Sequence, residues 1–161
     1  MAGVAKLFDG HILDKSNRNV DLNHEKYQGK VIGLYFSAHW CPPCRGFTPI
    51  LVDFYNKYGS EKNLEIIFIS SDNDEESFNE YYQEMPWLTL DFKEREKKNE
   101  LDEKFQIDGI PTLILLDGNS GNILCKDARQ EIQFNDKQGD RFPWTSSSET
   151  TKKSSRSCIC C

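Results

Sequence analysis

The sequence has no apolar run of about 18 residues, the minimum length that indicates a membrane-spanning helix. The first ten residues lack a positively charged segment followed by an apolar stretch, so we expect no secretory signal peptide. A glycine-rich dinucleotide-binding loop is also missing, so any nicotinamide or flavin must belong to a partner protein. These absences favour a soluble protein without an organic cofactor of its own.

The chain is also short of positive charge. Its 20 Lys and Arg residues stand against 26 Asp and Glu residues, which gives a net charge of −6. Lys152, Lys153 and Arg156 lie near the end, so the preceding part of the chain is more acidic than the total indicates. An acidic body opposes binding to phosphate backbones, and we therefore expect no nucleic-acid partner.

The six cysteines are not distributed as in a disulfide-stapled secreted protein. They form one Cys-x-x-Cys pair, one isolated residue and a terminal group, namely Cys41 and Cys44, then Cys125, then Cys158, Cys160 and Cys161. A chain of 161 residues can bury enough surface to fold without disulfides. We therefore expect a reducing compartment, cytoplasmic or also nuclear, and a structural role for Cys125 as a small hydrophobic residue.

Three mostly apolar runs, at residues 31–37, 64–70 and 112–117, are typical of strands that are covered on both faces. Between the first two, apolar residues recur at helical spacing from Phe47 to Tyr58. This spacing predicts a helix that begins at the cysteine pair and ends near residue 59. Pro49 should bend this helix without breaking it.

Two further helices are expected at residues 74–85, where the first turn is acidic, and at residues 93–105, which form a charged surface helix. Turn residues 117–121 predict a hairpin between the third strand and residues 123–125.

Strands that alternate with helices and end in a hairpin predict one α/β domain, a sandwich with a central sheet flanked by helices, over residues 1–144. After Trp144 the composition changes to Ser, Thr, Lys and Arg. Such a segment has too few apolar groups to offset the entropy of ordering, so we expect residues 145–161 to form a disordered tail.

Cys41 and Cys44 are the candidate catalytic residues because of their place at the start of a predicted helix. Unsatisfied N–H groups and the helix dipole favour negative charge there, which stabilises the first cysteine as a thiolate. Arg45 adds a nearby positive charge, and Pro42 and Pro43 fix φ where a missing N–H costs least. We expect Cys41 to attack a substrate disulfide and Cys44 to resolve the mixed disulfide, without a metal or other cofactor. An inert or metal-binding pair is the alternative.

The segment Tyr35-Phe36-Ser37-Ala38-His39-Trp40-Cys41-Pro42-Pro43-Cys44-Arg45 resembles the active-site segment of the nucleoredoxin and tryparedoxin family. Three further segments agree in order and approximate spacing: Met85-Pro86-Trp87-Leu88, Gly109-Ile110-Pro111-Thr112 and Phe142-Pro143-Trp144. The resemblance covers about residues 5–144 and implies a thioredoxin-like sandwich with a central mixed β-sheet. It also implies a thiol-disulfide oxidoreductase that reduces protein or small-molecule disulfides with electrons from an upstream thiol reductant.

The resemblance further implies a cis bond between Ile110 and Pro111, placed opposite the two sulfurs. In such a turn the backbone of Ile110 would pair with an incoming substrate. Trp40 is expected beside Cys41 as a flat apolar platform that contacts substrate. Trp87 is expected to be a packing residue or a weaker part of the site.

One position departs from ordinary thioredoxins, which carry a buried Asp where this chain has Tyr35. The proton acceptor for Cys44 is then unassigned, and a water or the carboxylate of Asp72 is a candidate. His39 is close enough in sequence to modulate Cys41, but a loop histidine is more often solvated, and we expect the latter.

Residues 158–161 match the prenylation box in form, with a cysteine four positions from the end. Cys161 is an unusual last residue for this box. The flexible spacer and its basic residues favour peripheral membrane attachment through lipidated Cys158, Cys160 or Cys161, because one lipid chain usually needs a second signal. The alternatives are extra redox thiols that pass electrons to the active pair, an exposed end without chemistry, and metal capture.

Two other classes of function stay open beside the leading hypothesis of an enzyme. Nucleoredoxin-like proteins also bind signalling partners, so the chain could be a redox-dependent adaptor with little turnover. A metal-binding module is the third class, and it predicts zinc in the purified reduced protein.

Overall fold

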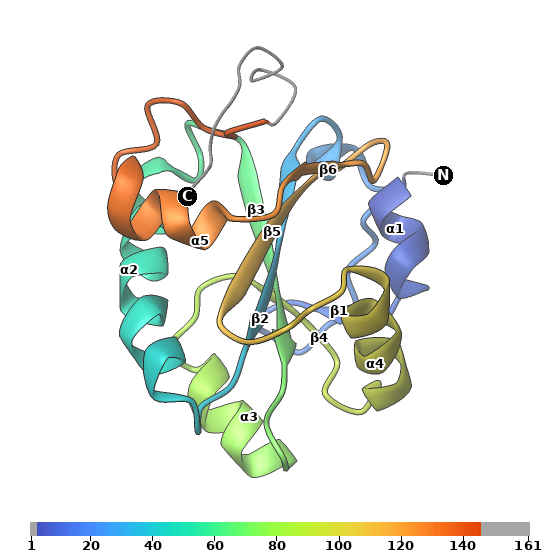
Figure 1. Ribbon diagram of the computed structural model, residues 1–161. Coiled ribbons are helices and arrows are strands. Elements are labelled where there is room, and N and C mark those ends of the chain that lie inside the picture. The colour runs from blue at the N-terminus through green and yellow to red at the C-terminus, as the bar shows by residue number, and fades with distance from the viewer. Residues whose placement is uncertain (1–2, 146–161) are drawn as a thin grey trace.

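The fold is built on one six-stranded mixed sheet, seen in a computed structural model that describes residues 3–145 (Figure 1). Its strand order is β1-β4-β3-β2-β5-β6. The strands are β1 (Ile12–Leu13), β2 (Val31–Ser37), β3 (Leu64–Ser70), β4 (Leu88–Leu90), β5 (Thr112–Asp117) and β6 (Ile123–Cys125). β2 runs parallel to β3 and antiparallel to β5, and the predicted mixed sheet is therefore confirmed.

The three central strands, β2, β3 and β5, have the bounds that their apolar runs predict. Nearly every residue in them is buried, because helices cover both faces of the sheet. The predicted hairpin is also present, since β5 pairs antiparallel with β6.

Helices lie on the two faces of this sheet. They are α1 (Gly3–Phe8), α2 (Pro42–Tyr58), α3 (Glu75–Tyr82), α4 (Arg95–Lys104) and α5 (Ala128–Gln130), with a 3-10 turn η1 (Glu25–Tyr27) and a π-helical turn η2 (Glu131–Asn135). Figure 1 shows α2 and α5 on one side of the sheet and α1 and α4 on the other. Two separate apolar clusters correspond to these two layers.

The predicted helices occur with small differences in length. The helix expected at residues 74–85 ends at Tyr82, and Asp74 caps it by accepting a hydrogen bond from the N–H of Ser77 at 2.8 Å. α2 continues through Pro49 without a break. The sequence patterns did not predict α1, β1, β4 or the helical segment at residues 128–135, which are all short or irregular.

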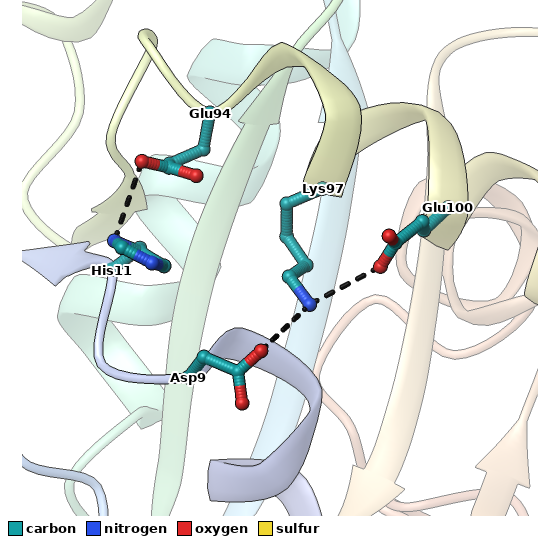
Figure 2. A network of polar contacts seen from close by, with 5 residues as sticks. All are labelled: Asp9, His11, Glu94, Lys97 and Glu100. Carbon is teal, nitrogen blue, oxygen red and sulfur yellow. Dashed lines mark hydrogen bonds and ion pairs between the residues drawn. The ribbon is translucent and has the colours of Figure 1, made fainter.

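A polar network ties the start of the chain to α4 (Figure 2). Lys97 on α4 binds Asp9, which follows α1, at 3.0 Å and Glu100 at 3.1 Å. His11, next to β1, lies 3.4 Å from Glu94, the residue that precedes α4. These contacts fix the α1–β1 segment against the outer side of the sheet, away from the cysteine pair on α2.

Candidate active site

Cys41 and Cys44 lie at the start of α2, where the sequence places them. Cys41 is the N-cap residue, and Cys44 follows in the first turn after the exposed Pro42 and Pro43. Both cysteines are reduced, but their burial differs: Cys41 is 5% exposed and Cys44 is 0% exposed. Cys41 is therefore the residue of the pair that a partner can reach from solvent.

The turn at Ile110 lies directly against these sulfurs. The thiol of Cys41 donates to the carbonyl oxygen of Ile110 at 3.8 Å, and the side chain of Ile110 packs on Cys41 and Cys44. The bond between Ile110 and Pro111 is cis. The cis bond and its position opposite the cysteines are therefore confirmed.

Trp40 projects from the loop before α2 and is 56% exposed. Its indole N–H donates to the carbonyl oxygen of Ser71 at 3.0 Å, which holds the ring in place while much of the residue stays exposed to solvent. The guanidinium of Arg45 is exposed and donates to the carbonyl oxygen of His39 at 2.6 Å. Trp87, in contrast, is 1% exposed and packs edge-on against Tyr35 and is therefore a core residue.

His39 is half-buried, and the expectation of a solvated loop histidine is wrong. Its imidazole stacks on the ring of Tyr81, with centroids 5.1 Å apart and planes 16° apart. The stacking brings α3 into contact with the loop that precedes Cys41.

Asp72 is buried and both of its carboxylate oxygens are engaged. One accepts the backbone N–H of His39 at 2.7 Å, and the other accepts the hydroxyl of Ser70 at 2.8 Å. The groups that shift the pKa of Cys44 are Cys41, Ser37 and Ala38, and Asp72 is not among them. The two hydrogen bonds of Asp72 therefore give it a role in holding the loop before Cys41.

Cys44 is held in its protonated form. Burial is the main reason, and it raises the pKa of Cys44 to about 12, with a further increase from hydrogen bonding to Cys41. Hydrogen bonds from the side chain of Ser37 and the backbone of Ala38 act in the opposite direction. Cys44 must therefore lose a proton before it can attack, and its polar neighbours influence the pKa at which it does so.

A buried group of four hydroxyls, here called the hydroxyl cluster, lies beside Cys44. The oxygens of Ser37 and Tyr81 are 2.7 Å apart, and Thr48 lies 2.6 Å from both Tyr81 and Tyr35. Burial raises the pKa of Tyr35 and of Tyr81, so both phenols stay neutral. Sequence reasoning noted only Tyr35, because these residues come from β2, α2 and α3 and meet only in the folded chain.

The other cysteines are separate in sequence from the Cys-x-x-Cys pair. Cys125 is half-buried in β6, and burial raises its pKa to about 12, as expected for a structural thiol. Cys158, Cys160 and Cys161 lie outside the described residues. Within residues 3–145 no group of three or more His, Cys, Asp or Glu side chains is placed to hold a metal ion. That same part of the chain contains no helix long and apolar enough to cross a membrane.

The sequence is similar to a thioredoxin-like family model and to two kinds of known protein. A family model described as thioredoxin-like matches residues 29–123. Tryparedoxin from Trypanosoma brucei brucei is 43% identical over 146 residues, which cover 89% of this chain and 99% of that protein. Human nucleoredoxin is 43% identical over 129 residues, 80% of this chain but 29% of that protein, so the chain spans less than a third of nucleoredoxin.

Solved structures show the same relationship. The structure of tryparedoxin from Trypanosoma brucei has 44% sequence identity and a TM-score of 0.84, covering 90% of this chain and 99% of that one. A structure of tryparedoxin II complexed with glutathionylspermidine has 38% identity and a TM-score of 0.84, covering 89% of this chain and 99% of that one.

Proposed function

Because this chain belongs to the thioredoxin-like family that includes tryparedoxin and nucleoredoxin, we propose that its dithiol reduces disulfides in protein or small-molecule partners. The protein is a thiol-disulfide oxidoreductase, and its chemistry is exchange of thiols and disulfides at Cys41 and Cys44. The observation that carries the assignment of roles is the unequal burial of the two residues, since Cys41 is 5% exposed and Cys44 is 0% exposed.

In the first step the thiolate of Cys41 attacks one sulfur of the substrate disulfide. A mixed disulfide forms, and the other substrate sulfur leaves as a thiolate that takes up a proton. The dipole of α2 favours the attacking anion at its N-terminus, although Pro42 and Pro43 carry no N–H and the N–H of Arg45 donates to the carbonyl oxygen of Cys41.

In the second step Cys44 attacks the sulfur of Cys41, and the second substrate thiolate leaves with the proton that Cys44 gives up. The substrate gains two electrons and two protons, and the enzyme keeps a disulfide between Cys41 and Cys44. An upstream thiol then reduces this disulfide by the reverse sequence of steps.

The surface around Cys41 supports a bound substrate. The open face of Trp40 offers an apolar platform, and the backbone of Ile110 offers polar groups beside the sulfur. The exposed Pro42 and Pro43 keep the rim rigid, and Arg45 fixes the carbonyl of His39 behind the loop. We assign these residues to substrate binding and support of the site.

We further propose that a low-molecular-weight thiol of the glutathione type is the upstream reductant. The support comes from a related protein, since tryparedoxin II has been solved with glutathionylspermidine, which contains a glutathione unit. Cys41 keeps 5% of its surface exposed and the preceding Trp40 is 56% exposed, so a ligand of that size can approach the thiol.

The cysteine usage also supports work in a reducing cytoplasmic or nuclear compartment. Attachment to a membrane through lipidated Cys158, Cys160 or Cys161 is a separate proposal that rests on the sequence alone. Intact-mass measurement of the protein from its native cell tests it, and an unmodified mass removes it.

The function is tested by reduction of insulin disulfides, with a glutathione-type dithiol as the electron donor. We expect turnover by the unaltered protein and by Cys125→Ser, none by Cys41→Ser, and a trapped mixed disulfide with Cys44→Ser. Negligible turnover in all four proteins, with partner capture that depends on oxidation state, would instead support an adaptor.

A further inference from the structure

The backbone directly after β3 holds the indole of Trp40. The carbonyl oxygen of Ser71 accepts the indole N–H at 3.0 Å, and Ser71 is the first residue after β3, which ends at Ser70. The place of the Trp40 ring on the surface of the site therefore depends on how firmly this short stretch of backbone is held.

Two consecutive peptide units in this stretch are hydrogen-bonded at both ends. A peptide unit is planar, so the carbonyl of one residue and the N–H of the next move together. Opposite the carbonyl that binds Trp40, the N–H of Asp72 donates to the hydroxyl oxygen of Ser70 at 2.9 Å. In the preceding unit, the N–H of Ser71 donates to the carbonyl oxygen of Ser37 on β2 at 2.9 Å. The carbonyl of Ser70 in that unit therefore points away from β2.

The strand on that side, β4, does not extend as far as this carbonyl. The pairing of β3 with β4 stops at Phe68 and Thr89, so Ser70 lies past the end of the ladder. Arg95, the first residue of α4, takes the place of the strand, because its Nη1 donates to the carbonyl oxygen of Ser70 at 2.8 Å. The guanidinium thus fixes the peptide unit from the side opposite to β2.

The guanidinium of Arg95 is itself held in one orientation. Its Nε donates to the carbonyl oxygen of Phe92 at 2.6 Å, and its Cζ lies 3.9 Å from the centroid of the Phe92 ring. That ring packs in turn on Phe78 of α3, with centroids 5.3 Å apart. A planar group that stacks on a ring and donates in two fixed directions is a property of arginine that a lysine ammonium does not reproduce.

We propose that Arg95 is a positioning residue for substrate binding, which fixes the peptide unit after Ser70 and, through it, the carbonyl that holds the indole of Trp40. Arg95 acts through the backbone and not on the sulfurs. The inference rests on the proposed function, in which Trp40 is the platform for the substrate. Without the guanidinium, the indole loses a fixed acceptor, so the substrate binds more weakly while the chemistry of Cys41 stays the same.

Steady-state reduction of insulin disulfides, with the dithiol donor in excess, tests this role through KM and kcat. Arg95→Met removes both directed hydrogen bonds but keeps an unbranched stem on Phe92. We expect its KM for insulin to rise about fivefold, as for the loss of one hydrogen bond, with kcat unchanged. A merely structural role would reduce the fraction of folded enzyme, and so lower the apparent kcat without moving KM.

Arg95→Lys is the milder variant and keeps the positive charge without the planar fork. It should also raise KM, by less than Arg95→Met. A KM equal to that of the unaltered protein would show that charge alone is sufficient, and would overturn the assignment to the two directed hydrogen bonds.

A double variant shows whether Arg95 acts through Trp40. Trp40→Phe removes the indole N–H and should itself raise KM. When it is combined with Arg95→Met, the KM should equal that of Trp40→Phe alone, because the group that Arg95 positions is already lost. Increases in KM that multiply in the double variant would place the effect of Arg95 elsewhere and contradict the proposal.

The indole N–H signals of protein labelled with ¹⁵N at tryptophan report the position of Trp40 without any turnover. The Trp40 signal, identified by its loss in Trp40→Phe, should move in Arg95→Met, while those of Trp87 and Trp144 stay in place. A stationary Trp40 signal would overturn the proposal. An unaltered protein that does not turn over insulin would instead contradict the proposed function, and the signal would still test the role of Arg95.

Lys98→Met is the matched control on the same helix. The ammonium of Lys98 binds Asp102 at 2.6 Å and its side chain is 16% exposed, so this variant also removes a partly buried cation from α4. Lys98 bonds within α4 and not to β3, so KM and the Trp40 signal should both stay as they are. Equal changes in Lys98→Met and Arg95→Met would show a general loosening of α4 and refute the positioning role.

Discussion

The carboxylate of Asp72 accepts the backbone N–H of His39 at 2.7 Å and so ties the end of β3 to the loop that leads into the cysteine pair. The same carboxylate accepts the hydroxyl of Ser70 at 2.8 Å. The side chain is 5% exposed, so these bonds form in a poorly solvated place. Asp72 therefore fixes the backbone two residues before the nucleophile.

Asp72→Ala should reduce the free energy of unfolding by about 1–3 kcal/mol, because it leaves the part-buried N–H of His39 without its partner. Urea unfolding measures this loss. The pH midpoint of the Cys44 closure step should stay the same. A change of that midpoint would mean that the carboxylate takes part in the ionisation of Cys44.

Asp136 supplies a second test, in the segment that follows η2. Its carboxylate accepts the backbone N–H groups of Asp140 and Arg141 and the indole N–H of Trp144, at 3.0, 2.7 and 2.9 Å. Burial opposes ionisation, but these donors outweigh it and hold the pKa of Asp136 below its ordinary value. Asp136→Ala should cost about 1–3 kcal/mol of unfolding free energy at neutral pH.

A lowered pKa gives the sign of the pH dependence of Asp136. The carboxylate stabilises the folded chain above its pKa in the unfolded state, about 3.9, and this contribution is lost as pH falls through the lower folded value. The gap in unfolding free energy between the unaltered protein and Asp136→Ala should therefore shrink below about pH 4. Asp53→Ala, which removes an exposed pair with Lys57, is the control and should change little at any pH. A gap that widens on acidification would contradict the assignment.

The thiol of Cys125 predicts how the free energy of unfolding changes at alkaline pH. Burial raises its pKa to about 12, while a thiol in the unfolded chain ionises near pH 8.5. Between these values the folded state holds a proton that the unfolded state has lost, so Cys125 lowers stability as pH rises, by at most about 1.4 kcal/mol per pH unit. The unaltered protein should therefore lose more unfolding free energy than Cys125→Ala between about pH 8.5 and about pH 10, within the window that these two pKa values define. Parallel losses, measured in urea under reducing conditions, would show that the thiol is not shielded.

Lys97 predicts a smaller and salt-dependent effect. It joins Asp9 to Glu100 on the outer layer of the fold, and its side chain is 17% exposed while both carboxylates are well exposed (Figure 2). Lys97→Met should cost about 0.5–1 kcal/mol in dilute buffer and less in about 1 M salt, because exposed ion pairs are screened. Disulfide turnover should not change. A loss that is equal at both salt concentrations would point to packing of the Lys97 stem as the cause.

The central part of the fold follows from local pattern alone. Three short runs are mostly apolar on both faces, at residues 31–37, 64–70 and 112–117. A run of this length and composition is typical of a strand that is covered on both sides. The cysteine pair begins α2 because Pro42 and Pro43 suit the first helical positions, so its chemistry was predictable as well. The elements that escaped prediction are short: β4 has three residues and β1 has two, and tertiary pairing decides them.

The hydroxyl cluster could not be predicted for a different reason. Ser37 and Tyr81 are 44 positions apart in the sequence. No local pattern around either residue indicates that their hydroxyls meet in the core. Asp72 attracted attention as a charged residue after β3, but its oxygens are already engaged by the backbone of His39 and by Ser70. Which polar group faces Cys44 depends on how α3 packs on β2, and that is settled only by the whole core.

The ends of the sheet have a consequence for behaviour in concentrated solution. The outermost strands are β1 and β6, with two and three residues, whereas the strands between them that carry most of the pairing have six or seven. Short edges expose few unpaired backbone groups to another molecule, and this limits strand-to-strand aggregation of the native protein. A chain whose centre is so rich in apolar strands can thus stay dispersed while its reactive sulfur remains open to partners.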